Sequence, residues 1–140
     1  MKASRLGREE GSALVIAMLL LVILTIIGIY AIQISTSEFG MATQTKMGKI
    51  SMNAAEAAAY AGIDALPVVT TVTGASLPNG ATYDYTASSI GSEPMVGFDT
   101  NWTQALFNVR GVGHPPSAWT GQKMVDAGVA YGPVPAGTGY

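Results

Sequence analysis

The sequence predicts an α+β protein in which one long amino-terminal helix packs on a small antiparallel sheet of three to four strands. An uncharged apolar run over residues 13–34 is followed by small and apolar residues at helical spacing as far as Leu66. After Pro67 the composition changes to threonine, valine, glycine, serine and proline, with short alternating stretches that are typical of strands. The chain has 140 residues, which is the length of one ordinary domain.

The apolar run is long enough to cross a membrane. Its polar side chains are Thr25, Tyr30 and Gln33. About 20 residues at roughly 1.5 Å per residue span a hydrocarbon core of about 30 Å, so we expect a membrane-spanning helix here. A cleaved secretory signal is disfavoured, because its apolar stretch is usually about 7 to 15 residues long.

The flanking charges orient this helix. Three bases precede the run, Lys2, Arg5 and Arg8, whereas the first base after it is Lys46. Positive residues near a membrane helix stay on the cytoplasmic side, so we expect the short amino terminus inside the cell and the rest of the chain exported.

The helical pattern continues beyond the membrane segment over residues 35–66 and ends at Pro67, because the residue before a proline disfavours the α region. Its outer half, NAAEAAAYAGIDAL at 53–66, is rich in alanine and glycine. High helix propensity alone would explain this composition. Small side chains also permit close approach, and we expect the head to pack on Ala54, Ala55, Glu56, Ala58, Ala61 and Gly62.

Three stretches alternate well enough to be strands, and a fourth is a candidate. The strands are predicted at 81–87, 105–112 and 123–131, with 68–72 as the candidate, and turn-rich connections at 77–80, 88–94 and 113–121. Such a sheet has one face that must be covered, and the alanine-rich helix is available to cover it. Arg110 and Asp126, on adjacent predicted strands, are candidates for a cross-strand pair.

Composition argues against several classes of function. The formal net charge is −2 and the four bases after Gly11 are scattered, so a nucleic-acid-binding patch is not expected. The chain has no cysteine, and its single histidine, His114, is predicted in a loop without a second ligand type nearby. No nucleophile has a base and an orienting acid beside it. We therefore expect no enzyme, no metal and no cofactor.

Three stretches resemble type IV prepilins, and in particular the PilX-type minor pilins. They are GSALVIAMLLLVILTIIG at 11–28, STSEFGMATQ at 35–44 and NAAEAAAYAGI at 53–63. The resemblance implies a type IV pilin-like fold with a leader at 1–11, a transmembrane stalk helix at 12–34, its exported half at 35–66 and a strand-rich head at 67–140. It further implies a location first in the bacterial inner membrane, with the head in the periplasm, and then in the pilus at the cell surface.

The resemblance also implies which residues are processed. Prepilin peptidase is expected to cut between Gly11 and Ser12 and the new amino terminus at Ser12 to be methylated; glycine gives close backbone access at the cut. Prepilins usually begin the mature chain with phenylalanine or methionine, and Ser12 departs from that pattern.

The second departure concerns assembly. Major pilins carry a glutamate as the fifth residue after the cut, where this chain has Ile16, and no acid occupies the membrane half. The absence suits a subunit that primes or caps the filament tip, as in tip-located pseudopilins. Partner pilins are expected to pack on the helix, with Leu14, Leu20, Leu24 and Gly28 as the stalk contacts. A type II secretion pseudopilin and an uncleaved, single-pass membrane-anchored binding module remain open as alternatives.

Overall fold

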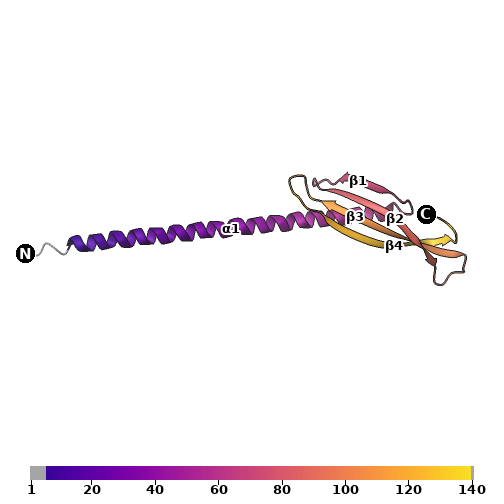
Figure 1. Cartoon of the computed structure of the whole chain (residues 1–140), viewed down its shortest axis with the longest axis horizontal. Helices are drawn as coiled ribbons and strands as arrows, with labels where there is room; N and C mark the ends of the chain where they lie inside the picture. Colours follow the sequence, from indigo (N-terminus) through magenta and orange to yellow (C-terminus); the bar gives the residue numbers. More distant parts are fainter. Residues whose placement is uncertain (1–5, 140) are drawn as a thin grey trace, which may run out of the picture. The chain divides into compact units, whose positions relative to one another are not determined.

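The computed structural model describes the backbone of residues 6–139 and the side chains of residues 11–139. One helix, α1 (Leu6–Asp64), is followed by four strands, β1 (Thr71–Ser76), β2 (Thr82–Pro94), β3 (Trp102–His114) and β4 (Lys123–Pro135) (Figure 1). The strands form one antiparallel sheet in the order β1-β2-β3-β4. The predicted α+β fold is confirmed. The chain divides into two compact units, Met1–Thr43 and Gln44–Tyr140, which are described in turn.

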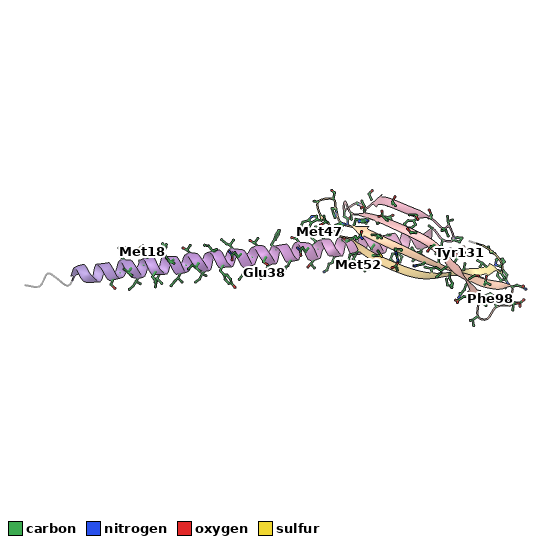
Figure 2. All side chains as sticks on the ribbon, viewed as in Figure 1. Met18, Glu38, Met47, Met52, Phe98 and Tyr131 are labelled. Carbon is green, nitrogen blue, oxygen red and sulfur yellow. The ribbon has the colours of Figure 1, made fainter. Side chains whose placement is uncertain are left out.

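The described part of the first unit is helix α1 alone. The side chains of residues 11–42 are all exposed, including those of Met18 and Glu38, which project from the helix in Figure 2. The hydroxyl of Thr25 donates to the carbonyl oxygen of Leu21 at 2.7 Å, and Thr36 donates to Ile32 at 2.9 Å. These polar groups are therefore satisfied within the helix, as an apolar environment requires. By length and composition the helix can cross a membrane.

Helix α1 ends within the second unit, two residues before the predicted end at Leu66. The backbone N–H of Leu66 donates to the carbonyl of Ile63 at 3.1 Å, which tightens the last turn. Pro67 follows directly, and the steric demand that it places on Leu66 gives a physical reason for the earlier stop.

All four strands differ from their predicted bounds: β3 covers Trp102–His114 and β4 continues to Pro135, and the differences in β1 and β2 are larger. β1 begins at Thr71 rather than at residue 68, because the turn after α1 continues to Val68, whose N–H donates to the carbonyl of Ala65 at 3.1 Å. Residues 88–94, predicted as a connection, belong to β2 and pair with β3. A β-bulge between Ser89 and Gly91 lets the strand continue, and Gly91 adopts a φ of 132° that side-chain-bearing residues rarely take.

The core of the head lies between β3 and the last part of α1. Ala105, Phe107 and Val109 point inward from alternate positions of β3 and are almost completely buried. Figure 1 shows the carboxyl part of α1 lying along one face of the sheet. Phe107 and Val109 are the largest fully buried side chains among the described residues, so the core is small.

Further along β3 the same inward row continues with Gly111 and Gly113 instead of larger residues. A Cβ atom added to Gly111 would lie 2.5 Å from the carbonyl oxygen of Ala55. One added to Gly113 would overlap the carbonyl oxygen of Ser51 and the backbone nitrogen of Ala55. The helix backbone therefore rests directly on the strand backbone, and only glycine on β3 permits this separation.

We predict that Gly111→Ala destabilises the head by about 1 to 3 kcal/mol, the usual cost of overpacking a tight contact. The matched control is Gly128→Ala on β4, because nothing lies within 4 Å of a Cβ added there. Denaturant unfolding of the full chain in detergent, followed by near-ultraviolet circular dichroism, measures both variants. Equal midpoints for the two variants would contradict the close helix–sheet contact.

Candidate functional site

The predicted processing site lies on the exposed surface of α1. Gly11 and Ser12 are both exposed, and nothing lies within 4 Å of a Cβ added to Gly11. Ile16 is also exposed, with 55 % of its surface accessible. Residues 11–37 contain no acid, and the first carboxylate after the processing site is that of Glu38. The helix therefore presents an uncharged surface over its whole membrane-length segment.

The four predicted stalk contacts, Leu14, Leu20, Leu24 and Gly28, are all exposed. Leu20 and Leu24 are one helical turn apart and line the same shallow apolar hollow, together with Ala17, Leu21 and Thr25. Leu14 and Gly28 do not line this hollow. An exposed surface of this kind can pack against another apolar helix by van der Waals contact.

The predicted contact between helix and head involves most, but not all, of the predicted residues. Ala54, Ala55 and Ala58 have no accessible surface, Gly62 is buried and Ala61 is half-buried. Glu56 is exposed, so its inclusion in this contact was wrong. Successive side chains of an α-helix point about 100° apart, so the side chain of Glu56 points away from the buried direction of Ala55.

Sequence reasoning missed four members of this contact. Ser51 and Ala59 are almost fully buried on the helix side, and Gly111 and Gly113 lie opposite on β3. The signal was present, because Ser51, Ala55 and Ala59 are four residues apart and the two glycines share one face of a strand. The hydroxyl of Ser51 donates to the carbonyl of Met47 at 3.1 Å, which satisfies the buried polar group.

Asp84 connects three strands on the opposite face of the sheet. From β2, its Oδ1 atom accepts the backbone N–H of Gly74 on β1 at 2.6 Å, and its Oδ2 atom lies 3.0 Å from Nε2 of His114. The hydrogen bond from Gly74 lowers the pKa of Asp84, with a smaller contribution from His114, and partial burial opposes the shift. His114 is the last residue of β3 rather than a loop residue, because the strand extends beyond its predicted end.

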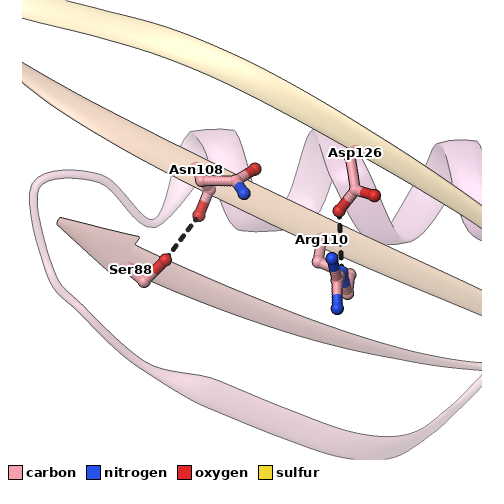
Figure 3. A network of polar contacts seen from close by, with 4 residues as sticks. All are labelled: Ser88, Asn108, Arg110 and Asp126. Atoms are coloured by element: carbon pink, nitrogen blue, oxygen red, sulfur yellow. Dashed lines mark hydrogen bonds and ion pairs between the residues drawn. The ribbon is translucent and has the colours of Figure 1, made fainter. Parts of the chain in front are cut away.

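A row of polar side chains crosses the same face (Figure 3). Nε of Arg110 and Oδ1 of Asp126 are 2.8 Å apart, which confirms the predicted cross-strand pair. The carboxylate raises the pKa of the Arg110 guanidinium above its ordinary value. Beside this pair, the hydroxyl of Ser88 donates to the carbonyl of Asn108 at 3.3 Å. Thr86, Ser88, Asn108 and Arg110 line a shallow hollow there.

Among the described residues, neither face of the sheet supplies a metal centre. Across residues 11–139, no group of three histidine, cysteine, aspartate or glutamate side chains is placed to hold a metal ion. The notable features are instead an exposed apolar helix surface and a head built on one helix face. Both are suited to packing against other protein surfaces.

Comparison with known protein families supports this interpretation. Residues 10–59 match the family described as PilX N-terminal. This segment of the chain is therefore similar to the PilX N-terminal family. The match includes Gly11, Ser12 and Ile16 as well as Ala54 to Ala58 of the helix face, and it ends before the sheet. No curated protein matches the chain, and no solved structure matches it either.

The PilX N-terminal family is one of type IV pilin-like minor pilins, which are structural and non-enzymatic proteins. The similarity of residues 10–59 to this family implies involvement in a type IV pilus and assembly with other pilins. The exposed apolar helix agrees with a location in the membrane before the pilus.

We predict that Asp84→Asn destabilises the head near neutral pH, because the bond from the Gly74 N–H loses its charged acceptor. The pKa of Asp84 is lower in the folded chain, so the carboxylate contributes stability above its unfolded pKa of about 3.9, and this contribution is lost as pH falls through the folded pKa. Urea unfolding of both chains at several pH values should give free energies that converge in acid. A difference that stays constant down to pH values below the unfolded pKa would contradict this role.

Proposed function

We propose that this chain is a minor pilin that is cut between Gly11 and Ser12 by prepilin peptidase, methylated at Ser12, and incorporated at or near the tip of a type IV pilus. The PilX N-terminal match supports the general class, since it includes the proposed cleavage site. The observation that carries the tip position is the uncharged stalk surface, with Ile16 at the fifth position of the processed chain.

The cleavage site has a simple physical basis. Gly11 has no side chain to obstruct a protease, and its surroundings are open. Cutting on the cytoplasmic side removes Lys2, Arg5 and Arg8. The apolar helix then holds the processed subunit in the membrane until it is assembled into the pilus. The leader bases then serve to orient the helix and have no role in the filament.

The electrostatics of the stalk support the proposed tip position. In pilins with an acid at the fifth position, the carboxylate is thought to meet the amino terminus of the preceding subunit. Such a charge costs about 2.5 to 3.5 kcal/mol at the centre of a membrane helix and less near its end, where Ile16 lies. A chain with Ile16 avoids this cost and also lacks the contact. A subunit at the tip has no preceding subunit and therefore does not need it.

The neighbours of the stalk are other pilins. When lipid is exchanged for protein, the exposed surface formed by Leu14, Leu20 and Leu24 gains close packing contacts, and Gly28 permits a nearer approach of a neighbouring helix. No charge on this surface selects one neighbour over another. The identity of the adjoining pilins would then be set by the exported part of the chain.

We predict that Gly11→Ala abolishes processing, whereas Gly28→Ala, at a second exposed glycine of the same helix, leaves it intact. Coexpression with prepilin peptidase should shift the mobility of the parent chain and of Gly28→Ala only. Amino-terminal sequencing of the membrane-extracted parent chain should begin at Ser12.

A start at Met1 or Lys2 in the presence of the peptidase would instead favour an uncleaved anchored binding module. A deletion strain that loses protein secretion but keeps its pili would favour a type II secretion pseudopilin. Either result would overturn the proposed role in the pilus.

A further inference from the structure

The hairpin between β2 and β3 contains a sequence pattern that the proposed function leaves unexplained. Residues 101–103 read Asn-Trp-Thr, which is the acceptor pattern for attachment of a glycan to asparagine. The other asparagines, Asn53, Asn79 and Asn108, do not fit this pattern. Bacterial enzymes that transfer a glycan to asparagine also select an acid two residues before it, and Asp99 lies at that position. The match is therefore more specific than the tripeptide alone.

Asn101 lies on an exposed turn directly before β3. The N–H of Trp102 donates to the carbonyl of Asp99 at 2.9 Å, so Asn101 is the third residue of a β-turn. The carbonyl of Asn101 accepts the N–H of Ala136 at 2.8 Å, which holds its backbone while its side chain remains exposed. Nδ2 of Asn101 donates to Oδ2 of Asp99 at 3.1 Å, and the side-chain amide has a second hydrogen that this bond does not use. The acceptor nitrogen is thus at the surface of the head.

The first residues of β3 are held weakly in the sheet. Trp102 is paired with Pro135 on β4, and Thr103 is paired with Pro94 on β2. A proline has no N–H, so neither partner can donate to the ladder. The hydroxyl of Thr103 reaches the carbonyl of Val134 only at 3.5 Å. Strand ends with few hydrogen bonds open at small free-energy cost, so the acceptor segment can enter an enzyme's site while the head stays folded.

The same hairpin carries exposed apolar side chains. Val96 is 97 % exposed, Phe98 52 % and Trp102 40 %, and Figure 2 shows Phe98 at the end of the head. Grouped apolar side chains at a surface commonly mark a region that another molecule covers. Sugar rings have apolar C–H faces that pack on aromatic side chains. A glycan on Asn101, the residue before Trp102, has the chemistry to cover this surface.

We infer that Nδ2 of Asn101 carries an N-linked oligosaccharide in the exported chain. The donor is an oligosaccharide joined to a lipid through pyrophosphate. In the transfer, Nδ2 forms a bond to the anomeric carbon of the first sugar, the bond from that carbon to the pyrophosphate oxygen breaks, and the lipid pyrophosphate leaves. Nδ2 loses one proton to solvent, and nothing is oxidised or reduced. The inference rests on the proposed function only in requiring that the head is exported.

The direct test is mass spectrometry of the full chain, extracted from membranes and from sheared filaments of cells that naturally produce it. Trypsin releases residues 50–110 as one peptide, because no lysine or arginine lies between Lys49 and Arg110. We expect most copies of this peptide to carry added mass equal to a whole number of sugar residues, and electron-transfer fragmentation to locate the mass at Asn101. An unmodified Asn101 would overturn the inference.

Three variants test whether the acceptor pattern determines the modification. Thr103→Ser keeps the pattern and Thr103→Ala removes it, while both shorten the same half-buried side chain. Asn101→Gln removes the acceptor at an exposed position. Sugar mass should be retained in Thr103→Ser and fall at least tenfold in Thr103→Ala and Asn101→Gln. Equal modification of the two Thr103 variants, or sugar mass that persists in Asn101→Gln, would overturn the inference.

The amino terminus of the same samples reports separately on the proposed function. A chain that begins at Ser12 with an unmodified Asn101 overturns the glycan and leaves the proposed processing intact. A chain that keeps its leader but carries sugar mass at Asn101 overturns the proposed processing and supports the glycan.

Discussion

The contact between the backbones of α1 and β3 is the constraint on which the head depends. Gly111 and Gly113 bring the strand against Ala55, and any side chain at these glycines would enter the space that the helix occupies. The head has few large buried side chains, so it gains little stability from volume alone. Much of its stability must come from this close fit, and the alanine-rich sequence of the helix follows from the same requirement.

The general fold could be predicted because its determinants are local. An uncharged apolar run, helical spacing up to Leu66 and alternation beyond Pro67 define one helix and a sheet. The extension of β2 over residues 88–94 could not be anticipated, since Gly91 in a bulge looks like Gly91 in a turn. The role of Gly111 also depended on the register between helix and strand, which no local pattern specifies.

The candidate sites also differ in whether their roles depend on local sequence or on strand pairing. Gly11, Ser12 and Ile16 could be selected from sequence, because their proposed roles depend on their order along one helix. Asp84 binds across β1 and β3, so its role depends on strand pairing. Glu56 was wrongly assigned to the contact between helix and head, because a run of small residues does not specify which face of the helix is buried.

Helix α1 therefore contains both the exposed apolar stalk surface and the helix face on which the sheet packs. The absence of an acid from the stalk is the feature that we propose determines the position of the chain in a pilus. Immunogold labelling of sheared filaments tests this claim most directly, with the parent chain and Ile16→Glu compared. The account predicts label at one filament end for the parent chain and along the shaft for Ile16→Glu. Label along the shaft for the parent chain, or the same position for both, would contradict it.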